Sequence, residues 1–309
     1  MALPQPLSPK APSLASGPPT GRFDSFDDFA AKLPSCLAPG PIAVIFVEDS
    51  IEVNSTISHH LGLGFGTIVV LAPEDLEIEV RLSEKVIRIT YRAVQSPDFA
   101  DFLNKIIAKA PKRWIYYCFN AEYLYYPFCE TRRIGEMLAF HAEERRAAML
   151  TYVIDIYAEN LHHYPNAVDR QSAHLDKSGY YALNREDPNK EWAAKDRQMD
   201  FFGGLRWRFE EHVPWEKRRI DRIGIFQSKP GLKVLADHRL SIEEMNTYAC
   251  PWHNNLTAAI CSFRTAKALK RNPGSTFDIQ TFKWHNSTPF HWTSQQLMDL
   301  GLMEPGQWF

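Results

Sequence analysis

The sequence lacks a long hydrophobic run, a regular cysteine pattern and an excess of charge of either sign. No apolar stretch approaches the ~20 residues that a membrane-spanning helix needs, so we expect peripheral membrane contact at most. The N-terminus also lacks the charged start and apolar core of a secretory signal peptide. The 35 Lys and Arg residues nearly balance the 37 Asp and Glu residues. Nucleic acid is therefore not an expected partner, because no general electrostatic attraction would hold it.

The cysteines form no recognisable framework. The chain has 5 of them, an odd number without C-x-x-C spacing. This pattern favours reduced, packed thiols over disulfides or a zinc knuckle and predicts a cytoplasmic protein. The residues are Cys36, Cys118, Cys129, Cys250 and Cys261.

Apolar residues are abundant enough for a large core, since they make up 45% of the 309 residues. Residues 1–38 are rich in proline, serine and alanine and predict a disordered tail. Residues 39–309 predict one domain, with a helical and aromatic C-terminal extension from about residue 240.

The order of the apolar segments predicts an α/β fold with a mostly parallel, twisted sheet flanked by helices. Ser96, Pro97 and Asp98 provide a strong start signal for a helix with one apolar face. Residues 158–216 lack periodicity and predict loops that line a site. Strands are expected at residues 41–47, 67–71, 85–91, 114–119, 149–157 and 220–226, and helices at 55–63, 99–107, 133–141 and 246–271, the last interrupted at Pro251-Trp252-His253.

Polar side chains follow two of the predicted strands at their carboxyl ends, where open α/β sheets bind ligands. Asn120 and Glu122 come directly after the strand at 114–119 and could hold a hard cation or sugar hydroxyls. An asparagine turn with a solvated glutamate is the alternative. Glu48 and Asp49 follow the first strand and could bind a nucleoside or cap a helix.

Four segments, in this order, resemble the bacterial glycosyltransferase family 2-like proteins of the GT-A fold over residues 41–309. Residues 59–65 are similar to the family's "YHxxLGF" helix end. Residues 114–127 resemble the segment "W…DxDEFLxYP" that carries the metal-binding DxD. Residues 153–157 resemble its "LDLY" strand, and residues 203–206 its "GGxR" turn.

The resemblance implies transfer of a sugar, with inversion, from a nucleotide-diphosphate donor to a glycan or lipid-linked acceptor. It also implies a role in bacterial surface polysaccharide or glycolipid synthesis, in the cytoplasm or peripherally at the inner membrane face. In that scheme Mg²⁺ or Mn²⁺ bridges the DxD carboxylates and the diphosphate, while a carboxylate base deprotonates the acceptor.

This chain departs from the family at the metal site, where Asn120-Ala121-Glu122 replaces the DxD. Asn120 and Glu122 remain candidate metal ligands with lower charge. Arginines at the "GGxR" turn or at Arg264, where the family tends to carry "HFK", could instead neutralise the diphosphate. The expected donor-binding residues are Glu48, Asp49, Asn120, Glu122, Gly203, Gly204, Arg206, Arg208 and Arg264.

The catalytic base is expected among three aspartates. We choose Asp200 because it lies just before the Gly203-Gly204 turn, while Asp221 and Asp237 remain open as alternatives.

Two other functions remain open. The weakened carboxylate set favours a catalytically silent relative that binds a nucleotide sugar or a glycan. A metal hydrolase would instead use His162, His163, His174, Asp169 and Asp176, because imidazole and carboxylate suit Zn²⁺ or Fe²⁺.

Overall fold

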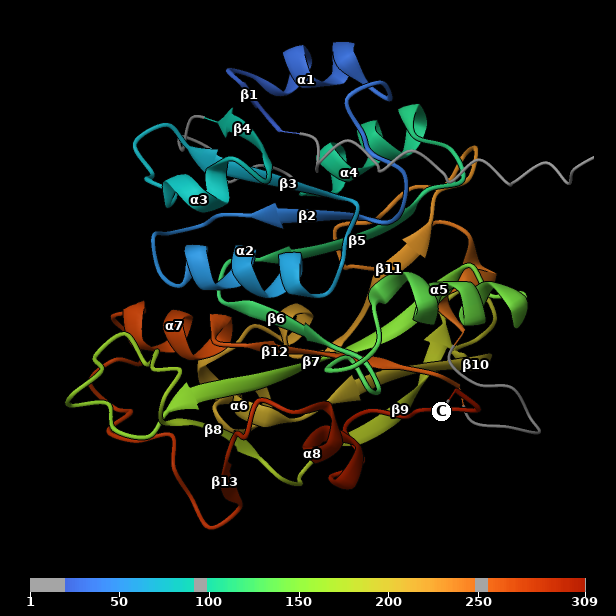
Figure 1. Ribbon diagram of the computed structural model, residues 1–309. Coiled ribbons are helices and arrows are strands. Elements are labelled where there is room, and N and C mark those ends of the chain that lie inside the picture. The colour runs from blue at the N-terminus through green and yellow to red at the C-terminus, as the bar shows by residue number, and fades with distance from the viewer. Residues whose placement is uncertain (1–19, 92–98, 248–254, 309) are drawn as a thin grey trace, which may run out of the picture.

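The computed structural model describes residues 20–91, 99–247 and 255–308 (Figure 1). Its strands are β1 (Gly21–Phe23), β2 (Ile42–Phe46), β3 (Thr67–Pro73), β4 (Ile87–Tyr91), β5 (Trp114–Phe119), β6 (Glu122–Tyr125), β7 (Ala148–Ala158), β8 (Ala173–Asp176), β9 (Tyr181–Asp187), β10 (Ala193–Phe202), β11 (Asp221–Gln227), β12 (Ala258–Ser262) and β13 (Ser287–Pro289). Its helices are α1 (Phe26–Lys32), α2 (Val53–Gly62), α3 (Val80–Ser83), α4 (Phe99–Lys109), α5 (Ile134–Glu143), α6 (Gly204–Arg208), α7 (Arg264–Arg271) and α8 (Ser294–Asp299), with short 3-10 turns η1 (Glu210–His212), η2 (Trp215–Lys217) and η3 (Glu243–Asn246).

One large sheet organises the molecule, with strand order β1-β4-β3-β2-β5-β11-β7-β12-β6. The pairs from β1 through β5 are parallel, as is the pair β7–β12. Strand β11 is antiparallel to both neighbours, and β6 is antiparallel to β12. This mainly parallel sheet flanked by helices confirms the fold class expected from the sequence and is consistent with a GT-A-like fold.

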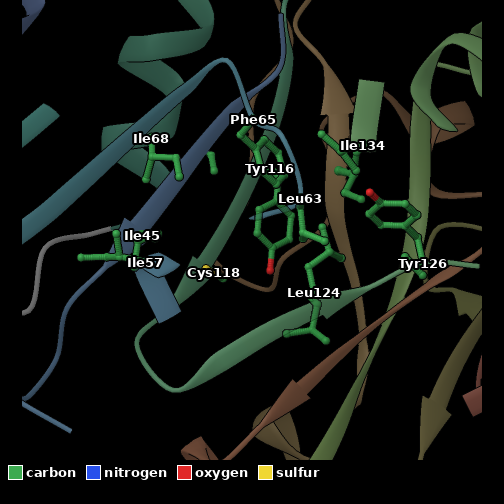
Figure 2. Close-up of a cluster of buried hydrophobic side chains, with 14 of the residues drawn as sticks. Ile45, Ile57, Leu63, Phe65, Ile68, Tyr116, Cys118, Leu124, Tyr126 and Ile134 are labelled. Carbon is green, nitrogen blue, oxygen red and sulfur yellow. The ribbon is translucent and has the colours of Figure 1, made fainter. Parts of the chain in front are cut away.

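Helices cover both faces of the sheet because the strands bury side chains on both sides. Along β2, Ala43 and Ile45 pack with α2 and α5 residues in the cluster shown in Figure 2. The alternate residues Ile42, Val44 and Phe46 pack with α4 on the other face. A strand buried on both faces requires a continuous apolar run rather than an alternating one, which is why these segments were recognisable in the sequence.

Residues 20–38 contain a strand and a helix, β1 and α1. Within the segment assigned to a tail ending at residue 38, β1 pairs with β4 and α1 packs on the α4 side of the sheet. Phe29 is fully buried, and the rings of Phe26 and Phe102 lie 4.1 Å apart. The average composition of residues 1–38 does not indicate these packed phenylalanines, because proline, serine and alanine dominate it. The expected tail boundary at residue 38 is therefore wrong for residues 20–38.

Two further expectations need correction. Residues 158–216 contain β8, β9 and β10 as well as loops, and β9 and β10 form a separate antiparallel sheet. Residues 246–271 are not one helix, because β12 precedes α7 and lies inside the main sheet between β7 and β6. The small apolar residues of β12 carry little local preference, so strand pairing decided their conformation. The expected signals at Ser96-Pro97-Asp98 and Pro251-Trp252-His253 lie outside the described residues.

Within the described residues, none of the helices combines the length and the hydropathy of a membrane span.

Candidate functional site

A cleft of about 660 Å³ lies beyond the carboxyl end of β2, between α7 and the segments at 212–219 and 236–238. Its volume falls in the range of ~300–1,000 Å³ typical of small-molecule sites. We call it the charged cleft. Its ionisable lining residues are Glu48, Asp49, Arg206, His212, Glu216, Lys217, Arg219, Asp221, Asp237, His238, Arg264, Lys267 and Arg271.

Three cations from one side of α7 face the acidic turn after β2. The Arg264 guanidinium donates to both carboxylate oxygens of Glu48, at 2.6 and 2.7 Å. Lys267 Nζ and Arg271 Nη1 donate to Asp49 at 3.0 and 2.6 Å. Residues at positions i, i+3 and i+7 share a helix face, so α7 presents a row of positive charge to the ends of the parallel strands.

The two acidic residues differ in burial. The side chains of Asp49 and Lys267 are largely buried, with 13% and 3% of their surface exposed. Burial would raise the pKa of Asp49, but Lys267 and hydrogen bonds from Ile51 and Asn120 outweigh it and lower the pKa. Glu48 and Arg264 are each 32% exposed. The cleft therefore has an inner ion pair fixed in the protein and an outer pair open to solvent.

Asn120 holds the acidic turn in place. Its Oδ1 accepts a hydrogen bond from the Glu48 backbone N at 2.8 Å. Its Nδ2 donates to Asp49 Oδ1 at 2.7 Å and to the Ile51 carbonyl at 2.8 Å. Since the side chain is fully buried, Asn120 acts by positioning Glu48 and Asp49.

Glu122 points into the protein interior. Its Oε2 accepts hydrogen bonds from Arg222 Nη1 at 2.8 Å and Phe119 N at 2.9 Å. Its Oε1 accepts from Arg222 Nη2 at 3.1 Å and Ser262 Oγ at 3.2 Å. Burial would raise the pKa of Glu122, but Arg222 outweighs that effect and lowers it to about 2.

These contacts test whether Asn120 and Glu122 fit Mg²⁺ or Mn²⁺. Both cations need open oxygen ligands, whereas the Glu122 oxygens accept four hydrogen bonds and the Asn120 oxygen is bonded to Glu48 N. The arrangement does not fit a metal. Sequence spacing could not reveal this, because the residue that binds Glu122 comes from β11, far along the chain.

The Gly203-Gly204 turn brings Arg206 to the charged cleft. Gly204 has φ +63°, and a Cβ there would lie 3.0 Å from Asp155 Oδ2, so glycine allows the close approach. The buried Asp155 forms an ion pair with Arg206 Nε at 3.4 Å. Arg206 Nε also donates to Thr265 Oγ1 at 3.1 Å. The arginine is thus held in one orientation.

Arg208 and Asp200, also expected at the site, do not line the cleft. Arg208 forms an ion pair with Asp176 at 3.1 Å and donates to the Phe282 carbonyl at 2.7 Å. Asp200 accepts from Arg185 at 2.8 Å and from Arg219 at 3.1 Å. Both side chains serve ion pairs between elements.

Of the three candidate bases, Asp221 and Asp237 do line the cleft. Asp221 is buried, which raises its pKa, and its oxygens bond to Phe201 N at 2.8 Å and Arg185 at 3.3 Å. Asp237 pairs with Arg239 and keeps 35% of its side chain exposed. Asp237 is therefore the most accessible of the three.

The histidines and aspartates considered for a hydrolase do not assemble. Asp169 accepts from Ser172 Oγ and from the backbone around it, while Asp176 is bound by Arg208. His162 and His163 are exposed. Over the described ranges, no group of three or more His, Cys, Asp or Glu residues could hold a metal.

Sequence reasoning missed Lys267, Arg271 and His238. The signal for the first two was present, because basic residues recur at i, i+3 and i+7 from Arg264. His238 Nδ1 lies 2.9 Å from Tyr117 Oη, and the His238 ring stacks on Phe99. No local sequence pattern indicates that His238 lines the cleft.

No family model matches the chain, and no curated protein matches it. Among solved structures, the crystal structure of S. aureus TarS 1-349, a glycosyltransferase, is similar at a TM-score of 0.28 and 15% identity. The match covers 37% of this chain and 36% of that one. The chain thus spans about a third of that TarS structure.

Proposed function

We propose that this protein binds a nucleotide-diphosphate sugar in the charged cleft and transfers the sugar to an acceptor hydroxyl. The observation that carries the proposal is the row Arg264, Lys267 and Arg271 on α7, joined by Arg206. It lies at the carboxyl edge of parallel strands, where open α/β sheets bind ligands. The sequence resemblance to family 2-like glycosyltransferases supports the same reaction.

The charge of the cleft suits this chemistry. A diphosphate leaving group gains negative charge as the glycosidic bond breaks, so fixed cations beside it lower the barrier. We assign the base that takes the acceptor proton to Asp237, because it lines the cleft and remains partly exposed. Inversion at the sugar and a bacterial surface polysaccharide or glycolipid as product complete the proposal and rest on the resemblance.

One observation favours a second candidate, a catalytically silent binder of nucleotide sugars. Glu122, the only carboxylate left in the DxD position, is committed to Arg222. A protein that has lost its metal ligands could retain donor binding without transfer.

Calorimetric titration with UDP, GDP and their sugars, followed by chromatography of the incubated donor, tests both candidates. Binding with slow release of free sugar from the donor supports the transferase. Binding without any turnover, with or without added acceptors, identifies the silent binder. Absence of binding to every nucleotide removes both.

A pair of variants locates the site. Arg271→Gln removes a cation from the cleft wall and should weaken nucleotide binding about tenfold. Lys85→Gln removes one exposed charge beyond α3, away from the cleft, and should bind as the unmodified protein does. Equal affinities for the two variants would place the nucleotide elsewhere.

A further inference from the structure

The outer ion pair of the charged cleft already has the geometry of a phosphate complex. Arg264 directs two donors at the two oxygens of Glu48, at 2.7 and 2.6 Å. A guanidinium binds phosphate through the same two-pronged contact. We infer that Glu48 stands in for the ligand, so that a donor diphosphate displaces it from Arg264 and binds without a divalent cation. This inference rests on the proposed function of the cleft.

Glu48 can leave at low cost. Its carboxylate is partly exposed and pairs with the side chain of Arg264. Ion pairs that solvent reaches contribute little to stability, because water screens the attraction between the charges. The hydrogen bond that anchors Glu48 to Asn120 uses the backbone N, so the turn keeps its shape when the side chain swings away.

Arg264 would stay in place after the exchange. Its guanidinium lies 3.6 Å from the centre of the Phe119 ring, and its backbone N donates to Ser262 Oγ at 3.2 Å. Packing on an aromatic face fixes the plane of a guanidinium. The arginine therefore offers a prearranged pair of donors to whichever anion replaces Glu48.

The inner pair would not exchange. Asp49 accepts from Lys267, Arg271, Asn120 and the Ile51 backbone, and little of it reaches solvent. Burial lowers the pKa of Lys267, and the carboxylate of Asp49 beside it opposes that effect. A bound diphosphate would then contact Arg264 directly. Lys267 and Arg271, on the same face of α7, would attract it electrostatically without direct contact.

The same contacts explain why a metal is not needed. In the family pattern the cation is held by carboxylates at the DxD position, but here Asn120 and Glu122 are bonded within the protein. The positive charge required at the diphosphate comes from α7 instead. The cleft thus supplies through side chains what a Mg²⁺ or Mn²⁺ ion would otherwise supply.

Titration with inorganic pyrophosphate and with UDP, each in EDTA and in Mn²⁺, tests the inference. Pyrophosphate has no ribose or base, so any direct contact of Glu48 with a nucleoside does not affect it. We expect similar affinity in EDTA and in Mn²⁺. Glu48→Gln should bind pyrophosphate about threefold to tenfold tighter, and Arg264→Gln about tenfold weaker or worse. Glu84→Gln, an exposed glutamate far from the cleft, is the matched control and should change nothing.

The outcomes separate this inference from the proposed function. If UDP binds only with Mn²⁺, or if Glu48→Gln binds pyrophosphate no tighter than the unmodified protein, the exchange is wrong while donor binding stands. If no nucleotide binds under any condition, the proposed function itself fails. Glu48→Ala serves as a second variant should the glutamine variant be unstable, and thermal unfolding of each protein identifies that case.

Discussion

Glu122 and Arg222 form a closed ion pair in the protein interior, with Nη1 and Oε2 2.8 Å apart and side chains 0% and 3% exposed. They join the first residue of β6 to β11, within the sheet that carries the charged cleft. The pair explains why the one acid retained at the expected metal position does not face a ligand. Glu122 therefore contributes to the stability of the fold by neutralising the buried Arg222.

Removing one partner of this pair should be costly. Glu122→Gln leaves Arg222 charged and buried without its counterion, and we expect a loss of about 3–5 kcal/mol in unfolding free energy. Urea denaturation measures it. The double variant Glu122→Gln with Arg222→Met should recover much of the loss, because the buried charge is gone. A single variant within ~1 kcal/mol of the unmodified protein would contradict a closed pair.

His60 predicts a dependence of stability on pH. Burial lowers its pKa from the usual 6.5 to about 3, with a smaller contribution from His59. Between these values the unfolded chain binds a proton that the folded protein excludes, so stability falls as the pH drops. The slope from this residue is about 1.4 kcal/mol per pH unit. Denaturant unfolding at several pH values measures this for the unmodified protein and for His60→Phe. The unfolding free energy of His60→Phe should depend less steeply on pH, by the equivalent of one proton. Equal slopes for the two proteins would contradict the low pKa of His60.

Gly203 should not tolerate a side chain. Its φ is +153°, and a Cβ would lie 2.2 Å from Tyr180 Cδ1. We expect Gly203→Ala to lower the unfolding free energy by about 2 kcal/mol or more, through backbone strain and overpacking. Gly62→Ala is the control, because no heavy atom lies within 4 Å of its added Cβ in α2. That variant should gain about 0.5–1 kcal/mol.

Substitution of Asp237 and of Asp200 should have different effects, because we propose the first as the catalytic base and the second as a partner in structural ion pairs. Asp237→Asn should lower the rate of sugar transfer about 10²–10⁴-fold with little change in nucleotide affinity. Asp200→Asn should keep the rate but lose about 1–3 kcal/mol of stability, because Arg185 is buried and loses a charged partner. Steady-state kinetics and thermal unfolding of both variants decide between them. A slow Asp200→Asn enzyme with normal stability would restore Asp200 as the base.

The sequence by itself determined the layered α/β architecture. Runs such as residues 42–46 and 114–119 are apolar at every position, and their short length and aromatic or β-branched residues favour a strand covered on both faces. It also placed Glu48, Asp49 and Asn120 at the carboxyl edge of the sheet, because strand direction follows from chain order. Arg206 and Arg264 were likewise expected near the ligand and line the cleft.

Only the tertiary structure decided what these side chains contact. Glu122 meets Arg222 because β11 runs antiparallel to β5, and Glu48 meets Arg264 because α7 packs across the end of β2. Both pairs join residues a hundred or more positions apart. Local periodicity encodes burial and direction, whereas the partner of a charge depends on which distant segment the whole fold brings within hydrogen-bonding distance.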